Sequence, residues 1–208
     1  MPIIGRPRQE EATDSNIIPA CKDCTVRIMP ESEVYVGKEP MSNGQLKRGV
    51  KLWMEIITHE NERFKGYKLF PAYPVTENAD GKQPWWGTVQ LYKYMRQCGL
   101  DYILKYVDES HPDYQSAAVD APQLDCVSNP EKGYEKLVKF YLTGTLVDDT
   151  GKTFTSPNGG LVNKLVKVSI GSPTKNKETG IEDTGMVKPL TIGSKAAAED
   201  SSHHNSSI

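Results

Sequence analysis

The sequence predicts a mainly β domain with one main helix, an α+β fold, set between flexible N- and C-terminal arms. Apolar and polar residues alternate over residues 50–58, apolar spacing becomes helical over 85–98, and further apolar segments follow at 137–147 and 162–170. A period of two indicates a strand with one face in a core, and a spacing of three and four residues indicates a helix. The predicted element order is therefore strand, strand, strand, helix, strand, strand.

The first three strands lie in the N-terminal half of the chain. A first strand region runs over residues 26–36, interrupted by a proline. In the second, over residues 50–58, the apolar residues face one way while Lys51 and Trp53 face the other. The third, over residues 67–75, contains two prolines, which indicates an edge strand or a strand end.

The helix and the last two strands complete the domain. The helix over residues 85–98 stops at Gly99, because glycine readily adopts the left-handed conformation that ends helices. A second helical turn over residues 102–107 leads into an acidic loop over residues 108–129 that is rich in proline and alanine. The two remaining segments are predicted as strands that close the domain.

This order leads to an architecture and to domain boundaries. Five strands with a single helix between the third and the fourth is the order of an OB-fold, a small Greek-key barrel. The alternative is another five-stranded α+β domain with the same order. We expect a flexible N-terminal arm over residues 1–24, the OB-fold-like domain over 25–170, and a disordered C-terminal tail over 171–208.

Composition limits the function classes. The chain has 208 residues and a formal net charge of −2, which excludes binding of polyanions by bulk electrostatics. It contains no run of about eighteen apolar residues, and its first residues lack the pattern of a signal peptide. We therefore expect a soluble, cytoplasmic protein with no membrane partner, in which the four cysteines stay reduced.

The outward residues of the predicted strands combine cations with aromatic rings. Cations neutralise phosphates and each ring can stack on a base, at about 1–3 kcal/mol per base, so the pattern is typical of single-strand binding. The candidate nucleic-acid-binding residues are Arg27, Tyr35, Arg48, Lys51, Trp53, Lys68, Phe70, Lys139 and Tyr141.

These residues also have plainer interpretations. For Trp53 and Phe70 the alternative is burial beneath the helix or the long loop, and for the lysines it is a solvated face. Trp85 and Trp86 are interpreted as core residues at the start of the helix rather than as stacking rings.

The pair Cys21 and Cys24 is the candidate metal site. Its two-residue gap lets two thiolates reach one tetrahedral zinc ion. A complete site needs four ligands, and the chain offers no second pair at this spacing. We expect two reduced thiols and no cofactor, with a zinc-stabilised adaptor as an alternative.

Motifs of catalysis are missing from the sequence. There is no Gly-x-x-x-x-Gly-Lys-Ser/Thr phosphate loop, no Gly-x-Ser-x-Gly elbow and no His-Glu-x-x-His helix. The acidic residues of the loop over 108–125 have no basic partner at fixed spacing. We expect that the protein is not an enzyme.

Three segments resemble small phage-encoded single-stranded-DNA-binding proteins that often lie beside recombination genes. The matching features are residues 42–44 before a strand, residues 52–56 within it and residues 63–70 after it, supported by the helix that ends at 98–100 and by a late hairpin. The resemblance covers about residues 25–170 and implies an OB-fold that coats single strands during phage replication or recombination. The C-terminus departs from the acidic, apolar-ended tip with which many bacterial-type single-strand binders recruit partners.

Two function classes follow. The first is a single-stranded-DNA-binding protein in the host-cell cytoplasm, with DNA, replication or recombination proteins and further copies of itself as partners. The second is a virion component of the head, neck or tail, in which terminal arms order against neighbouring subunits and no nucleic acid is bound.

Overall fold

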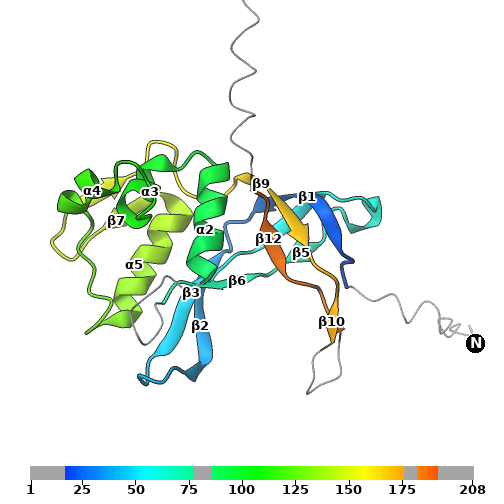
Figure 1. Cartoon of the computed structure of the whole chain (residues 1–208), viewed down its shortest axis with the longest axis horizontal. Coiled ribbons are helices and arrows are strands. Elements are labelled where there is room, and N and C mark those ends of the chain that lie inside the picture. Colours follow the sequence, from blue (N-terminus) through cyan, green and yellow to red (C-terminus); the bar gives the residue numbers. More distant parts are fainter. Residues whose placement is uncertain (1–16, 77–85, 176–181, 192–208) are drawn as a thin grey trace, which may run out of the picture.

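The computed structural model describes residues 17–76, 86–175 and 182–191. They form a mixed α+β domain in which a curled, antiparallel five-stranded sheet makes half of a barrel. Figure 1 shows α3, α4 and α5 grouped at one end of the molecule and the sheet at the other, with α2 between them. Among the described residues no helix is both long and apolar enough to cross a membrane.

Strands, then α-helices, then further strands follow one another along the described residues. They are β1 (Cys21–Ile28), β2 (Glu33–Pro40), β3 (Leu46–Lys51), β4 (Met54–Thr58), the 3₁₀ turn η1 (Glu62–Phe64), β5 (Lys68–Leu69), β6 (Ala72–Pro74), α2 (Trp86–Gln97), α3 (Asp101–Val107), α4 (Tyr114–Ala117), η2 (Ala118–Asp120), α5 (Pro130–Thr143), β7 (Thr145–Val147), β8 (Thr153–Thr155), β9 (Leu165–Ile170), β10 (Thr174–Lys175), β11 (Glu182–Asp183) and β12 (Val187–Pro189).

The main sheet has the strand order β12-β9-β1-β4-β5, and a second sheet has the order β2-β3-β6. The two sheets are continuous, because the β4–β5 ladder and the β3–β6 ladder share one register. Met54 pairs with Leu69 in the first, and Val50 pairs with Tyr73 in the second. Between these pairs the Leu52 N–H donates to the carbonyl of Pro71 at 2.9 Å. β3–β4 and β5–β6 are therefore two long bent strands, and the predicted second and third strands are confirmed.

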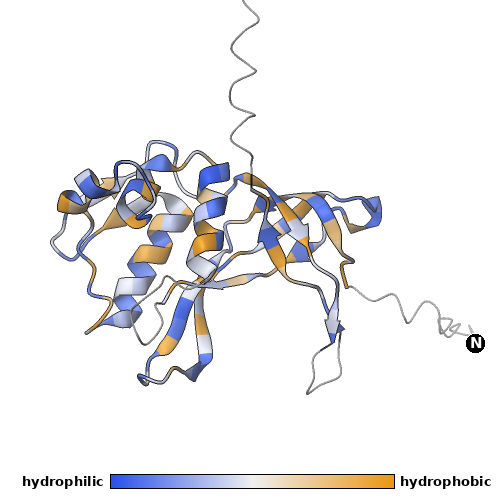
Figure 2. Cartoon of the chain, in the orientation of Figure 1, coloured by the Kyte–Doolittle hydropathy of each residue, from blue (hydrophilic) through white to orange (hydrophobic). Residues whose placement is uncertain are grey.

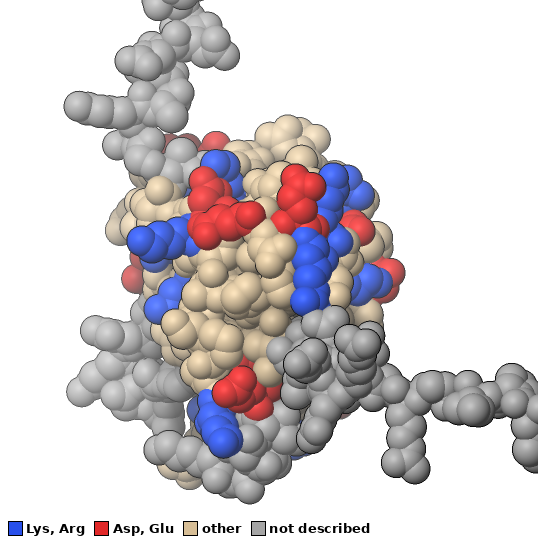
Figure 3. Space-filling model, turned by 90° about the vertical axis from the view of Figure 1, so that its right-hand side faces the viewer, with Lys and Arg blue, Asp and Glu red and all other residues tan. Residues whose placement is uncertain are grey.

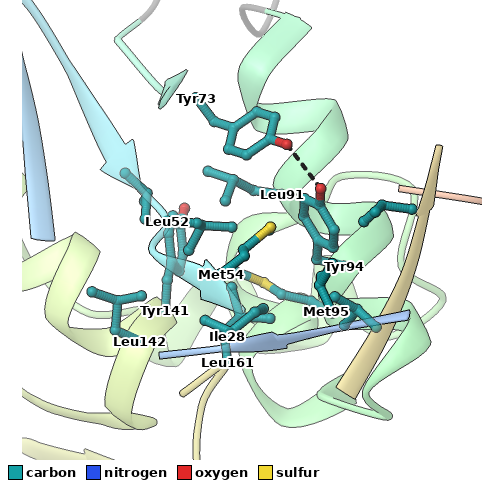
Figure 4. Close-up of a cluster of buried hydrophobic side chains, with 14 of the residues drawn as sticks. Ile28, Leu52, Met54, Tyr73, Leu91, Tyr94, Met95, Tyr141, Leu142 and Leu161 are labelled. Atoms are coloured by element: carbon teal, nitrogen blue, oxygen red, sulfur yellow. Dashed lines mark hydrogen bonds between the residues drawn. The ribbon is translucent and has the colours of Figure 1, made fainter. Parts of the chain in front are cut away.

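The inward face of this sheet forms the core with α2 and α5. The four apolar residues that alternate along the second predicted strand, Val50, Leu52, Met54 and Ile56, all have 0% exposure. Figure 4 shows two of them packed against side chains of α2 and α5. In Figure 2 hydrophobic and hydrophilic colours alternate along both helices, as expected for helices with one buried face. The prediction that the apolar side chains of the second strand face the core is confirmed.

The predicted main helix is confirmed as α2, and the predicted second turn as α3. Gly99 separates them with a φ of 63°, the left-handed conformation expected from the sequence. Gln97, the last residue of α2, holds the sheet: its side chain accepts from the Lys167 N–H at 2.8 Å and donates to the carbonyl of Leu190 at 2.7 Å. This contact ties α2 to β9 and to the chain just after β12.

The predicted strand over residues 137–147 is wrong, because most of this segment belongs to α5. The side chain of Asn129 caps the helix by accepting from a backbone N–H, and Pro130 occupies its first turn. The helix ends at Gly144, which has a φ of 78°, and β7 begins at the next residue. The fold therefore has four helices in its described part, and the expectation of one main helix is corrected.

The boundaries of the predicted arms also change. β1 begins at Cys21, so the Cys-x-x-Cys pair lies in a strand and not in an arm. In the predicted tail, β12 pairs with β9 and becomes an edge of the main sheet, with Val187 buried. Residues 1–16, 176–181 and 192–208 lie outside the described part, and so does Trp85.

Candidate nucleic-acid interface

The outward face of the half-barrel carries the aromatic pair that the sequence singled out. Trp53 lies on the long strand β3–β4 and Phe70 on the long strand β5–β6. The register of the β4–β5 ladder places them opposite each other. Their ring centroids are 4.9 Å apart and their planes meet at 84°, an edge-to-face contact. Phe70 is 49% exposed and Trp53 is half-buried, so the pair lies at the surface and not in the core.

The local backbone fixes the position of Trp53. The chain leaves regular strand geometry between β3 and β4, and the Trp53 N–H donates to the hydroxyl of Ser32 at 3.0 Å. The carbonyl of Trp53 accepts from the Met29 N–H at 2.7 Å. The indole N–H is buried and has no acceptor among the described residues. The ring is therefore held in place by its backbone and by Phe70.

Cations surround this pair, but most of them face a carboxylate. The ammonium of Lys51 lies 5.7 Å from the Trp53 ring centroid and 3.2 Å from Glu33. Arg27 lies 3.8 Å from Glu55, and both side chains are partly exposed. Exposed ion pairs contribute only about 0–1 kcal/mol, so a phosphate can replace the carboxylate at little cost.

Lys68 extends the row of cations. It pairs in register with Glu55, is exposed, and makes no ion pair within the described part of the chain. The face as a whole mixes both charge signs, and Figure 3 likewise shows acidic and basic side chains interleaved on one side of the molecule. Binding at this face would depend on ring contacts at least as much as on net charge.

A cleft of about 630 Å³ continues the face on the far side of Phe70. One wall is the strand β5–β6, and the other is the chain from Asp183 to Val187. Trp86 and Met186 line it and are 40% and 54% exposed. Trp86 was predicted to be a core residue, and this is wrong: its ring lies at the surface, edge-on to Tyr73 at 6.0 Å.

Two further predicted residues lie on the β2–β3 hairpin. Tyr35 pairs with Gly49 across the ladder and is half-buried. Successive side chains of a strand point to opposite faces of the sheet. Lys51 and Trp53 are odd-numbered and point outward, so the even-numbered Arg48 belongs to the other face. The structure thus brings Arg27, Lys51, Trp53, Lys68 and Phe70 together and leaves Arg48 outside the group.

The last two predicted residues lie elsewhere. Lys139 and Tyr141 belong to α5, not to an outward strand. Tyr141 has 2% exposure and is part of the core, where burial raises the pKa of its hydroxyl. Lys139 is exposed and lines a separate hollow between α5 and the start of β2. A buried ring cannot stack on a base, so the assignment of Tyr141 to the interface is wrong.

The cysteine pair does not fit a zinc site. Both thiols are free and buried in β1, and burial, with the nearby Cys21 and Asp23, raises the pKa of Cys24 to about 12. Four ligands complete a structural zinc site, so the pair would need two more side chains. The described residues contain no group of three or more His, Cys, Asp or Glu side chains that could hold a metal.

The sequence reasoning missed the far wall of the cleft. Thr184, Met186 and Val187 lie in the segment that was predicted as tail. The available signal was two apolar groups in an otherwise polar stretch, at residues 186–187 and 190–192. Comparison with protein-family models, curated proteins and solved structures gave no match.

Proposed function

We propose that the half-barrel is an OB-fold and that its outward face binds single-stranded DNA. Taken as long strands, β1–β2, β3–β4, β5–β6, β9 and β12 number one to five, and their order in space is five-four-one-two-three. The helices lie between the third and the fourth strand. In an OB-fold the second and third strands and the loops beside them bind oligonucleotides.

The observation that carries the proposal is the position of the Trp53–Phe70 pair. It spans the second and third strands, where an OB-fold binds its ligand, and Lys51 and Lys68 lie beside it. An exposed ring offers a stacking surface to any base, while the two ammonium groups can neutralise neighbouring phosphates. Recognition of this kind is tolerant of sequence and sensitive to salt.

The biological setting follows from the resemblance to phage single-strand binders. A protein of this kind coats unpaired DNA during phage replication or recombination, in the cytoplasm of the host cell. Replication and recombination proteins, and further copies of the chain, would then be its partners. The proposal requires no catalysis and no metal.

The test compares binding of single-stranded and double-stranded oligonucleotides at two salt concentrations by fluorescence anisotropy. We expect preference for single strands and weaker binding at high salt. Trp53→Ala and Phe70→Ala should each weaken binding about 5- to 150-fold, which corresponds to about 1–3 kcal/mol per stacked base. Circular dichroism spectra of both variants establish that they are folded.

A matched control lies at the other end of the molecule. Lys105 of α3 stands 4.6 Å and 4.8 Å from the ring centroids of Tyr102 and Tyr106, a second cluster of a cation with aromatic rings. Figure 1 shows α3 far from β5. Lys105→Ala should bind like the wild type. Equal affinity for single and double strands at low salt would refute the proposal, as would equal losses in all three variants.

A further inference from the structure

The cleft beside Phe70 lies at the open seam of the half-barrel. In the described part of the chain, no ladder joins β12 to β5 or β6. The seam is bridged by a side chain instead, because the Tyr73 hydroxyl donates to the carbonyl of Val187 at 2.9 Å. The cleft lies against this bridge, since both Tyr73 and Val187 line it.

The strand at one wall of the cleft offers unpaired backbone groups. The Leu52 N–H bonds to Pro71, so odd-numbered residues of β5–β6 direct their backbone groups toward β3–β4. In an antiparallel ladder the intervening residues point the other way. Lys68, Phe70 and Ala72 therefore direct their N–H and C=O groups into the cleft, where the described residues provide no partner.

Aromatic surface leads from the proposed DNA face into this space. Phe70 touches Trp53 on one side and lines the cleft on the other. Trp86 lines the same cleft, standing edge-on to Tyr73. Phe70 therefore joins the proposed DNA face to the cleft, and a strand bound at Trp53 would reach the cleft over its ring.

The chemistry of the cleft fits a base better than a phosphate or a peptide. Its cation is Lys68 and its anion is Asp183, so it offers no net positive charge to a phosphate. A peptide strand added to the edge of β5–β6 would satisfy only one of its own two edges, because at the other wall the carbonyl of Val187 already accepts from Tyr73. A planar base needs apolar surface for its faces and donors and acceptors for one edge, and both are present.

We infer that this cleft takes one unstacked nucleobase of the bound strand and reads its edge through the backbone of β5–β6. The inference rests on the proposed function and adds a base preference at one position of an otherwise tolerant binder. Backbone groups offer both a donor and an acceptor, and a well-made pair of hydrogen bonds to one base edge discriminates by about tenfold.

The experiment measures binding of dT, dA and dC homopolymers of equal length by anisotropy. The wild type should prefer one of them by about tenfold. Ala72→Leu, which fills the cleft, should remove the preference and keep binding, whereas Trp53→Ala should weaken all three alike. Met186→Ala, at the far wall, should also reduce the preference. This variant tests the cleft even if Ala72→Leu does not fold.

The possible outcomes separate the two proposals. A wild type that binds single strands but treats the three homopolymers equally overturns the cleft assignment and leaves the proposed function standing. A preference that survives in both cleft variants also overturns it, and is expected if a polypeptide strand occupies the cleft instead. A wild type that binds no oligonucleotide refutes the proposed function itself.

Discussion

The bridge between Tyr73 and Val187 yields the sharpest prediction about stability. The Tyr73 hydroxyl lies 2.9 Å from the carbonyl of Val187 and 2.8 Å from the hydroxyl of Tyr94, and all three residues are buried. Burial raises the pKa of both tyrosines, so both hydroxyls stay protonated at neutral pH. Tyr73 therefore donates to the carbonyl, and Tyr94 donates to Tyr73. Figure 4 shows the hydrogen bond between the two hydroxyl groups.

The two hydroxyls differ in what their removal leaves behind. Tyr73→Phe leaves both the Val187 carbonyl and the Tyr94 hydroxyl without a partner in the core, and should lower the free energy of unfolding by about 2–3 kcal/mol. Tyr94→Phe keeps the bond to Val187, and should cost about 1 kcal/mol. In the double variant only the carbonyl is left unpaired, so its cost should be smaller than the sum of the single costs.

Urea unfolding followed by tryptophan fluorescence measures all three changes through the midpoint, with the slope unchanged. Hydrogen exchange at β12 provides a local check, because loss of the bridge should speed exchange of its amides. Equal costs for the two single variants, or additive costs in the double variant, would show that Tyr73 does not connect β12 to the rest of the core.

Two titratable groups give the remaining predictions. Burial acts to raise the pKa of Asp148, but hydrogen bonds from the Thr150 hydroxyl and from the N–H groups of Gln123, Lys152 and Thr150 outweigh it and lower the pKa to about 2. A depressed carboxyl pKa stabilises the fold above the unfolded value of about 3.9. Stability should fall as pH drops from about 4 toward 2, and less so in Asp148→Asn; an equal acid dependence of unfolding in both proteins would contradict this. Cys24, with a pKa of about 12, should resist iodoacetamide at pH 8 until the protein unfolds, as peptide mass spectrometry can show; rapid native alkylation would contradict its burial.

The sequence predicted the second strand best, because its local alternation of apolar and polar residues matches its burial in the fold. Alternation along residues 50–56 placed Leu52 and Met54 inward and Trp53 outward, and the structure confirms this. The pairing of Trp53 with Phe70 then follows from the register of β4 and β5, whose connection contains η1 and the buried Phe64. The inward and outward facing depends on alternation within one strand, which is why a single sequence sufficed to predict it, whereas the contact between the two rings was not predicted.

Prediction failed at α5 because its apolar residues fit two periods. Val138, Phe140 and Leu142 alternate as in a strand, while Val138, Tyr141 and Leu142 have helical spacing, and all four are buried. The deciding signals lay at the ends, in the Asn129 cap and in Gly144. A run of this kind is assigned correctly only when its caps are weighed with its period.

The cleft escaped prediction because its far wall depends on a distant pairing. β12 has three residues and one of them is proline, so its sequence alone does not indicate a strand. It pairs with β9, and it is fixed further by Tyr73 and, through Leu190, by the Gln97 side chain, both of which are far away in the sequence. A short strand that owes its position to such contacts cannot be read from local pattern.

The third long strand connects stability and the proposed binding through its alternation. The side chains of Leu69 and Tyr73 are buried, while Phe70 is exposed and Ala72 is half-buried, so one strand belongs to both the core and the interface. Substitutions at its odd positions should therefore change the free energy of unfolding, and those at its even positions should change the affinity for DNA (Phe70) or the base preference (Ala72). A set of variants along residues 69–73 whose stability and affinity changed together, without this parity, would contradict the assignment of the outward face.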